Sequence, residues 1–186
     1  MEADEQYLLR AFQRGNLDAF GILVHRYQDR LYTSLVRFLD NQEDAQDVMQ
    51  ETFLSAFANA RRFKGQSRFY TWIYRIAMNH AIDLHRRKKP RQTLSISQVN
   101  QEEPADPNEA EGPQQTLIRE EDRQWLRTAL KSLSDEHRMV IVMKEIDDMR
   151  YEEIAEVLDV PVGTVRSRLH RARLELKDAL EQQQKQ

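Results

Sequence analysis

The 186-residue sequence contains no cysteine, and only five glycines and five prolines. Without cysteine, disulfides, thiolate metal sites and cysteine nucleophiles are excluded together. The scarcity of glycine and proline, with a charged fraction of 32% and an apolar fraction of 40%, favours amphipathic helices around a buried core over a sheet.

Long apolar runs are also absent. No segment approaches the roughly 20 apolar residues that span a bilayer, and the N-terminus (1–6) lacks the positive region of a secretory signal. We therefore expect neither a signal nor a membrane anchor, and a cytoplasmic location. The five histidines show no metal-ligand spacing, and no phosphate loop or nucleophile motif is present. The sequence therefore predicts no enzyme, cofactor or metal site.

Positive charge is concentrated in two blocks, although the net charge is −3. Residues 61–91 contain ten Lys or Arg and one acid, and residues 161–177 contain five Lys or Arg and one acid. Between them, residues 98–118 carry five acids and no base. Two basic blocks around an acidic spacer indicate two contacts with a polyanion, although a solvated helix face would explain either block equally well.

Helical periodicity runs along most of the chain, so the sequence predicts an all-α fold. We expect two small helical domains, at residues 1–90 and 117–186, with four helices each. The expected helices cover about 4–14, 18–39, 43–63, 67–89, 117–133, 134–146, 151–158 and 164–180, with Asp18 and Thr164 as caps. Residues 91–116 hold three prolines and five acids, a composition that predicts a flexible linker.

Residues 151–177 have the pattern of a helix-turn-helix, with Asp159 near the place where a turn glycine is usual. In the second helix an apolar stripe lies opposite an outward basic face. That face comprises Arg166, Ser167, His170 and Arg171, with Arg168 and Arg173 at its flanks. Arginine pairs bidentately with guanine in the major groove, and flanking arginines suit phosphates. An ordinary basic amphipathic helix is the alternative.

The helix expected at 43–63 carries acids around an outward leucine, opposite an inward stripe that begins at Ala45. This acidic face comprises Asp44, Asp47, Gln50, Glu51 and Leu54. An acidic patch around one apolar side chain suits a basic protein partner, although single exposed leucines are common.

The helix expected at 67–89 interleaves aromatic and basic side chains. Stacking a base on an aromatic ring contributes about 1–3 kcal/mol while cations hold the backbone, so the pattern suits single-stranded nucleic acid. Core packing is the competing interpretation. Core packing is favoured for Trp72, Ile73 and Ile76. For Phe69 and Tyr70, core packing and contact with nucleic acid are evenly balanced.

Together these motifs resemble the extracytoplasmic-function (ECF) sigma factors of bacteria, within the sigma-70 family. Residues 44–53 resemble the polymerase-docking signature, residues 69–77 the −10 element segment, and residues 151–155 with 161–169 the −35 reading motif. The motifs follow the family order and spacing, and the family's third domain is missing as in this minimal group.

The resemblance implies a non-enzymatic sigma factor that binds core RNA polymerase and promoter DNA. The acidic face would dock on the clamp helices of the largest subunit, and the domain at 117–186 on the flap. The loop 65–68 would hold a flipped −10 base, on a surface comprising Lys64, Gln66, Ser67, Arg68, Phe69, Tyr70, Trp72, Arg75, Asn79, Asp83, Arg86 and Arg87. The −35 element would be read by Thr164, Arg166, Ser167, Arg168, His170, Arg171 and Arg173.

The resemblance also bears on position 170, on the acidic linker and on how the chain is regulated. The family has an aromatic residue at position 170, so the contact of His170 stays open. The acidic linker would follow the RNA exit path. An anti-sigma factor, often tied to a membrane protein, would hold the chain inactive at the inner face of the membrane.

Two further classes of function compete with this one. A helix-turn-helix repressor or activator that works without polymerase explains residues 151–177 but leaves residues 44–54 and the aromatic helix without a role. A helical scaffold that binds only protein does not explain the basic face at 166–173.

Overall fold

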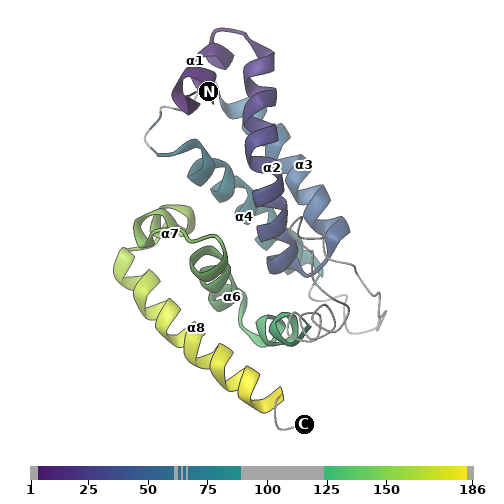
Figure 1. The fold of residues 1–186 in the computed structure, drawn as a ribbon, viewed down its shortest axis with the longest axis vertical. Helices are drawn as coiled ribbons and strands as arrows, with labels where there is room; N and C mark the ends of the chain where they lie inside the picture. Colours follow the sequence, from purple (N-terminus) through teal and green to yellow (C-terminus); the bar gives the residue numbers. More distant parts are fainter. Residues whose placement is uncertain (1–3, 61–62, 64, 66, 89–123, 184–186) are drawn as a thin grey trace, which may run out of the picture.

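The computed structural model describes residues 4–60, 63, 65, 67–88 and 124–183. Regular structure in these residues is entirely helical, which confirms the all-α prediction (Figure 1). The predicted linker at 91–116 and the start of the helix predicted at 117–133 lie outside the described residues. None of the described helices is both long and apolar enough to cross a membrane.

The first half is a bundle of α1 (Glu5–Gln13), α2 (Leu17–Leu39), α3 (Gln42–Asn59) and α4 (Phe69–Lys88). Its core is rich in aromatic rings. Phe12 and Phe20 lie 4.9 Å apart between ring centroids, and Phe20 meets Phe69 edge-on at 6.5 Å. Aromatic pairs in such tilted and edge-on arrangements bury a large apolar area, so this cluster joins α1, α2 and α4 in one core.

Local capping differs in places from the sequence prediction. Asp18 does not cap α2; the Asn16 side chain does, accepting a hydrogen bond from the amide of Ala19. A side chain from a distant segment binds the first turn of α4: Glu5 accepts a hydrogen bond from the amide of Phe69 at 3.0 Å. Glu5 also accepts one from the Tyr27 hydroxyl, whose pKa rises to about 12 through burial and this carboxylate.

The second half comprises helical residues 124–132, α6 (Asp135–Ile141), the π-helical turn η3 (Val142–Ile146), α7 (Tyr151–Leu158) and α8 (Val162–Gln183). Ser134 caps α6, at the residue where the sequence predicts this helix to start. The π turn was not predicted. α8 begins two residues before the predicted start, because the amides of Thr164 and Val165 both bond to the carbonyl of Pro161. Thr164 therefore lies inside the first turn of α8 instead of capping it.

The two halves pack against each other, with α7 beside α4 and η3 beside α2 (Figure 1). Arg138 of α6 is buried near this contact, 6% exposed. Its guanidinium donates to the carbonyls of Leu130 (2.9 Å), Lys131 (2.9 Å) and Phe38 (3.0 Å). The first two belong to helical residues 124–132 and the third to α2, so one side chain joins three segments from both halves.

We expect Arg138→Met to lower the free energy of unfolding by about 1–3 kcal/mol, because buried carbonyls lose their donor. Urea titration followed by far-ultraviolet circular dichroism measures this change. The control is Arg171→Met, since Arg171 is exposed on α8 and its loss is expected to stay within about 0.5 kcal/mol. Equal unfolding free energies for the two variants would contradict the role assigned to Arg138.

Candidate nucleic-acid interfaces

α8 separates an apolar face from a basic one, as the sequence predicts. Val165, Leu169 and Ala172 are at most 1% exposed and hold the helix on α6 and α7. The opposite face is exposed and comprises Arg166, Ser167, His170 and Arg171. In a helix-turn-helix, such outward residues of the second helix meet base edges in the major groove.

The two flanking arginines of α8 already have acidic partners. Arg168 lies 3.1 Å from a carboxylate oxygen of Glu136 in α6. Arg173 donates twice to the same oxygen of Glu145, at 2.9 and 2.7 Å, and these bonds raise its pKa further. Both side chains are thereby oriented at the edges of the basic face.

The turn between α7 and α8 depends on an aspartate in the left-handed region. Asp159 ends α7 at φ 54° and ψ 48°, a conformation that glycine, asparagine and aspartate adopt most readily. Asp159 therefore takes the left-handed conformation that a glycine would take at this turn. At the other end of α7, Glu153 accepts a hydrogen bond from the Arg150 amide at 2.9 Å and fixes the first turn.

The aromatic helix α4 keeps most of its rings inside. Phe69 is 0% and Tyr70 7% exposed, so in this arrangement neither ring is available to stack on a base. Both rings are packed in the core in this arrangement, and their contact with −10 DNA stays a prediction. Trp72 is half-buried, with its ring 4.9 Å from that of Phe63.

The polar residues predicted on the same surface divide into two groups. Those exposed at the start of α4 and along it are Arg68, Arg75, Asn79, Asp83, Arg86 and Arg87, and Ser67 is half-buried. Lys64 and Gln66 lie outside the described residues. α4 therefore presents a basic exterior over an aromatic interior.

The predicted acidic face forms on α3. Asp47, Gln50 and Glu51 are exposed, and Leu54 is 71% exposed among them. Asp44 instead pairs with Lys88 at the end of α4, and Glu51 lies 3.6 Å from His80. An exposed leucine within an acidic rim remains the feature best suited to a basic protein partner.

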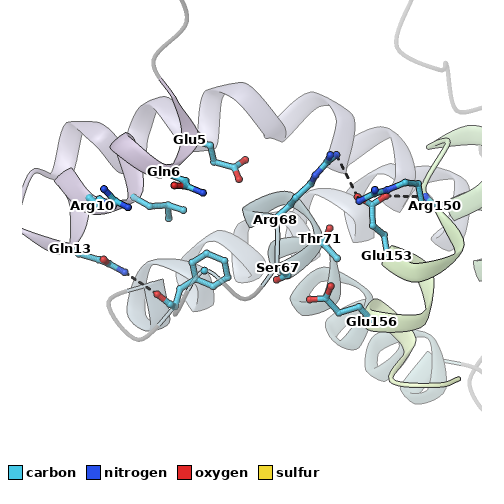
Figure 2. Close-up of a pocket in the computed structure, with 13 residues that line it drawn as sticks. Glu5, Gln6, Arg10, Gln13, Ser67, Arg68, Thr71, Arg150, Glu153 and Glu156 are labelled. Atoms are coloured by element: carbon cyan, nitrogen blue, oxygen red, sulfur yellow. Dashed lines mark hydrogen bonds and ion pairs between the residues drawn. The ribbon is translucent and has the colours of Figure 1, made fainter. Parts of the chain in front are cut away.

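A groove of about 630 Å³ lies where α1, the start of α4 and α7 meet (Figure 2). Gly65, Ser67 and Arg68 line it from the first half, and Glu153 and Glu156 line it from the second. Arg68 reaches across to Glu153 at 3.5 Å. The loop predicted to hold a flipped base therefore faces two carboxylates of the other half.

The polar contact between the halves was not predicted from the sequence. Asp147, which follows η3, is 6% exposed. Its carboxylate accepts hydrogen bonds from Tyr74 of α4 at 2.7 Å and from Ser34 of α2 at 2.8 Å. No periodic pattern marks these residues, since Asp147 and Asp148 look like ordinary loop acids. Asp147 directly follows the π turn, which the sequence also does not mark.

Family models for two conserved regions match the two halves. The model of Sigma-70 region 2 matches residues 23–91, and the model of Sigma-70 region 4 matches residues 123–176. The matches cover the α2–α4 bundle and the helix-turn-helix respectively, so the class of protein is that of the sigma-70 factors.

Relatives match almost the whole chain. The ECF RNA polymerase sigma-E factor of Escherichia coli is 39% identical over 173 residues, which cover 91% of this chain and 90% of the relative. The RNA polymerase sigma-H factor of Pseudomonas aeruginosa is 34% identical over 184 residues, or 97% of this chain and 95% of the relative.

Among solved structures, CnrH in complex with the cytosolic domain of CnrY aligns with a TM-score of 0.71 at 28% identity, over 95% of this chain and 97% of that chain. The chain therefore belongs to the family of ECF RNA polymerase sigma factors.

The buried carboxylate gives a pH prediction. Burial raises the pKa of Asp147, while its bonds to Tyr74 and Ser34 act against the rise. A carboxyl whose pKa is higher in the folded state binds its proton more tightly there, so its contribution to stability falls as the pH rises above the unfolded-state value. We expect the stability of wild type relative to Asp147→Asn to be greatest at low pH and to decline toward neutrality.

The measurement is urea unfolding of both proteins between pH 3.5 and 7, with only the difference between them interpreted. Other carboxyls cancel in that difference, because both chains share them. A difference that is constant with pH, or that grows toward neutrality, would contradict the raised pKa.

Proposed function

We propose that the chain is an ECF-type sigma factor that binds core RNA polymerase as a non-enzymatic subunit and directs it to promoters. The observation that carries this proposal is the match of both sigma-70 regions, in order, to one chain. The proposed division is a promoter-opening domain at 1–90, an acidic linker at 91–116 and a helix-turn-helix domain at 117–186.

In this proposal α8 reads the −35 element. The exposed residues Arg166, His170 and Arg171 are the candidates for base edges, with Ser167 beside them. Arg168 and Arg173 lie at the flanks, where phosphates pass, and Thr164 lies in the first turn. The acidic partners of both flanking arginines keep their side chains ordered before DNA arrives.

The surface of α4 reads and opens the −10 element. Arg68, with Ser67 and Gly65 in the preceding loop, offers polar groups to a flipped base. Arg75, Arg86 and Arg87 extend positive charge along the helix, and Asn79 and Asp83 lie between them. Phe69 and Tyr70 support this surface from below, because their rings are buried.

The acidic face of α3 docks on the clamp helices of the largest polymerase subunit, and the helix-turn-helix domain on the flap. Leu54 supplies the apolar centre of this contact, and Asp47 and Glu51 its charged rim. The chain works in the cytoplasm, where an anti-sigma factor at the inner membrane face restrains it. The complex of CnrH with a cytosolic domain supports a protein partner in that compartment.

The proposal is tested by separating its two activities. Arg171→Ala is expected to reduce initiation at promoters with an intact −35 element at least tenfold, a loss of about 1.4 kcal/mol, while core binding stays unchanged. Asp47→Lys with Glu51→Lys is expected to reduce core binding at least tenfold, because the charge of the docking face is reversed. Core binding is measured by fluorescence anisotropy and initiation by run-off transcription.

Wild-type protein that neither binds core polymerase nor permits specific initiation would refute the proposed function. Loss of core binding in Arg171→Ala, or unchanged core binding in the double variant, would refute the division of labour between α3 and α8.

The pairing of Arg173 with Glu145 predicts the salt dependence of promoter binding. In Glu145→Gln the guanidinium is released for a phosphate, so the slope of log K against log salt is expected to steepen by about 0.9 in the polymerase complex. Filter binding at several salt concentrations measures the slope. Asp178→Asn, at an exposed site on α8, is the control and is expected to leave it unchanged. An unchanged slope in Glu145→Gln would contradict the release of Arg173 from Glu145 onto a phosphate.

A further inference from the structure

Tyr151, the first residue of α7, brings an aromatic ring to the edge of the basic face of α8. Its side chain is half-buried and packs against the core. The guanidinium carbon of Arg166 lies 5.9 Å from the centre of this ring, and the ammonium nitrogen of Lys144 in η3 lies at the same distance. A cation within about 6 Å of an aromatic ring is attracted by the π electrons of the ring. One ring therefore attracts a cation of η3 and a cation of α8.

The two cations differ in their other contacts. The Lys144 ammonium donates to the carboxylate of Asp148 at 3.1 Å and to the carbonyl of Met149 at 3.2 Å, so it is held by the loop before α7. Arg166 is exposed on the outward face of α8, and within the described part of the chain it pairs with no carboxylate. Arg166 is therefore the cation on this ring that is accessible to DNA.

A ring orients an arginine in a different way from a carboxylate. Arg168 and Arg173 pair with Glu136 and Glu145, and such pairs use the N–H donors of the guanidinium. The ring of Tyr151 attracts the positive charge as a whole and accepts no ordinary hydrogen bond in exchange. A guanidinium held in this way keeps its donors for a guanine, which presents O6 and N7 in the major groove.

The position of the ring is itself fixed at both ends. Arg166 and Arg173 lie about two helical turns apart, so they share one edge of α8. Hydrogen bonds to Glu145 raise the pKa of Arg173, and the Tyr151 side chain adds to that rise. Tyr151 therefore reaches from one arginine to the other, while its ring packs against the core.

We propose that Tyr151 is a positioning residue for −35 recognition, which holds Arg166 in the orientation that reads a base and leaves its N–H donors free. This inference rests on the proposed role of Arg166 in reading the −35 element. A long side chain loses conformational freedom when it is immobilised on a partner, and one that is already oriented loses less. Tyr151 therefore increases discrimination at the base pair that Arg166 reads and has little effect at the other base pairs.

The size of the expected effect follows from the exposure of the contact. A cation–π contact at an exposed site changes an equilibrium about two- to fivefold. Removal of the arginine itself also removes its pairing with the base, so a larger loss of about tenfold is expected there. The effect of Tyr151 is thus smaller than that of Arg166 and falls on the same base pair.

The test uses the holoenzyme, formed from this chain and core polymerase, with a pool of DNA duplexes whose −35 and −10 regions are randomised. Sequencing of the bound duplexes gives the preference at each base pair. Arg166→Ala is expected to lower the preference about tenfold at the base pair that Arg166 reads. Tyr151→Leu is expected to lower it about two- to fivefold at the same base pair, and Tyr151→Phe, which keeps the ring, is expected to retain it.

Two further variants separate positioning from a general loss of folding. Tyr151→Leu combined with Arg166→Ala is expected to lose no more preference than Arg166→Ala alone, because Tyr151 acts through Arg166. Tyr7→Leu is the matched control, since Tyr7 is 66% exposed on α1, and it is expected to leave every preference unchanged. Thermal melts of each variant confirm that the chain is folded.

Three results would overturn the proposal. These are an unchanged preference in Tyr151→Leu, an equal fall at every base pair, and a loss in Tyr151→Phe as large as that in Tyr151→Leu. The last result would assign the effect to the hydroxyl group, as expected for a tyrosine that binds a phosphate directly.

Failure of this inference is distinguishable from failure of the proposed function. A wild-type holoenzyme that enriches no −35 sequence refutes the sigma function. A wild-type holoenzyme that enriches a −35 element through Arg166, with the same preference in Tyr151→Leu, refutes the positioning role of Tyr151 alone.

Discussion

The packing of the two halves against each other includes one buried carboxylate, whose hydrogen bonds to water are replaced by hydrogen bonds from protein donors. Asp147 is 6% exposed and accepts hydrogen bonds from Ser34 and Tyr74, which belong to the other half. The donors and the acceptor are each buried by the contact, so losing one side leaves polar groups without partners. Arg138 adds a second link through the carbonyl of Phe38. These polar groups thus add directional contacts to an apolar core that the two helical bundles share.

This contact has unequal consequences for the two basic surfaces. α8 lies on the far side of α6 and α7 from the first half (Figure 1), whereas the loop before α4 lies against α7. The basic face of α8 is therefore exposed in this arrangement, whereas the loop before α4 is partly covered by α7.

Helix positions and the chemistry of exposed faces were predictable from the sequence, because helical periodicity and charge are properties of neighbouring residues. The faces around Asp47 and Arg171 are where the pattern places them. Caps were less predictable: Asn16 and Asp18 are equally suitable residue types, and the choice depends on where the preceding loop enters. The burial of Phe69 and Tyr70 depends on distant rings such as Phe20 and Tyr27, which no local pattern encodes. The Asp147 contact joins residues over one hundred positions apart, through a π turn without a sequence signature.

The account's central claim is that the acidic face of α3 binds core polymerase while the basic face of α8 reads the promoter. The most direct measurement is core binding and specific run-off initiation by wild type beside Arg171→Ala. The account predicts that Arg171→Ala binds core polymerase like wild type and loses initiation at promoters with an intact −35 element. Loss of core binding in Arg171→Ala, or unchanged initiation, would contradict it.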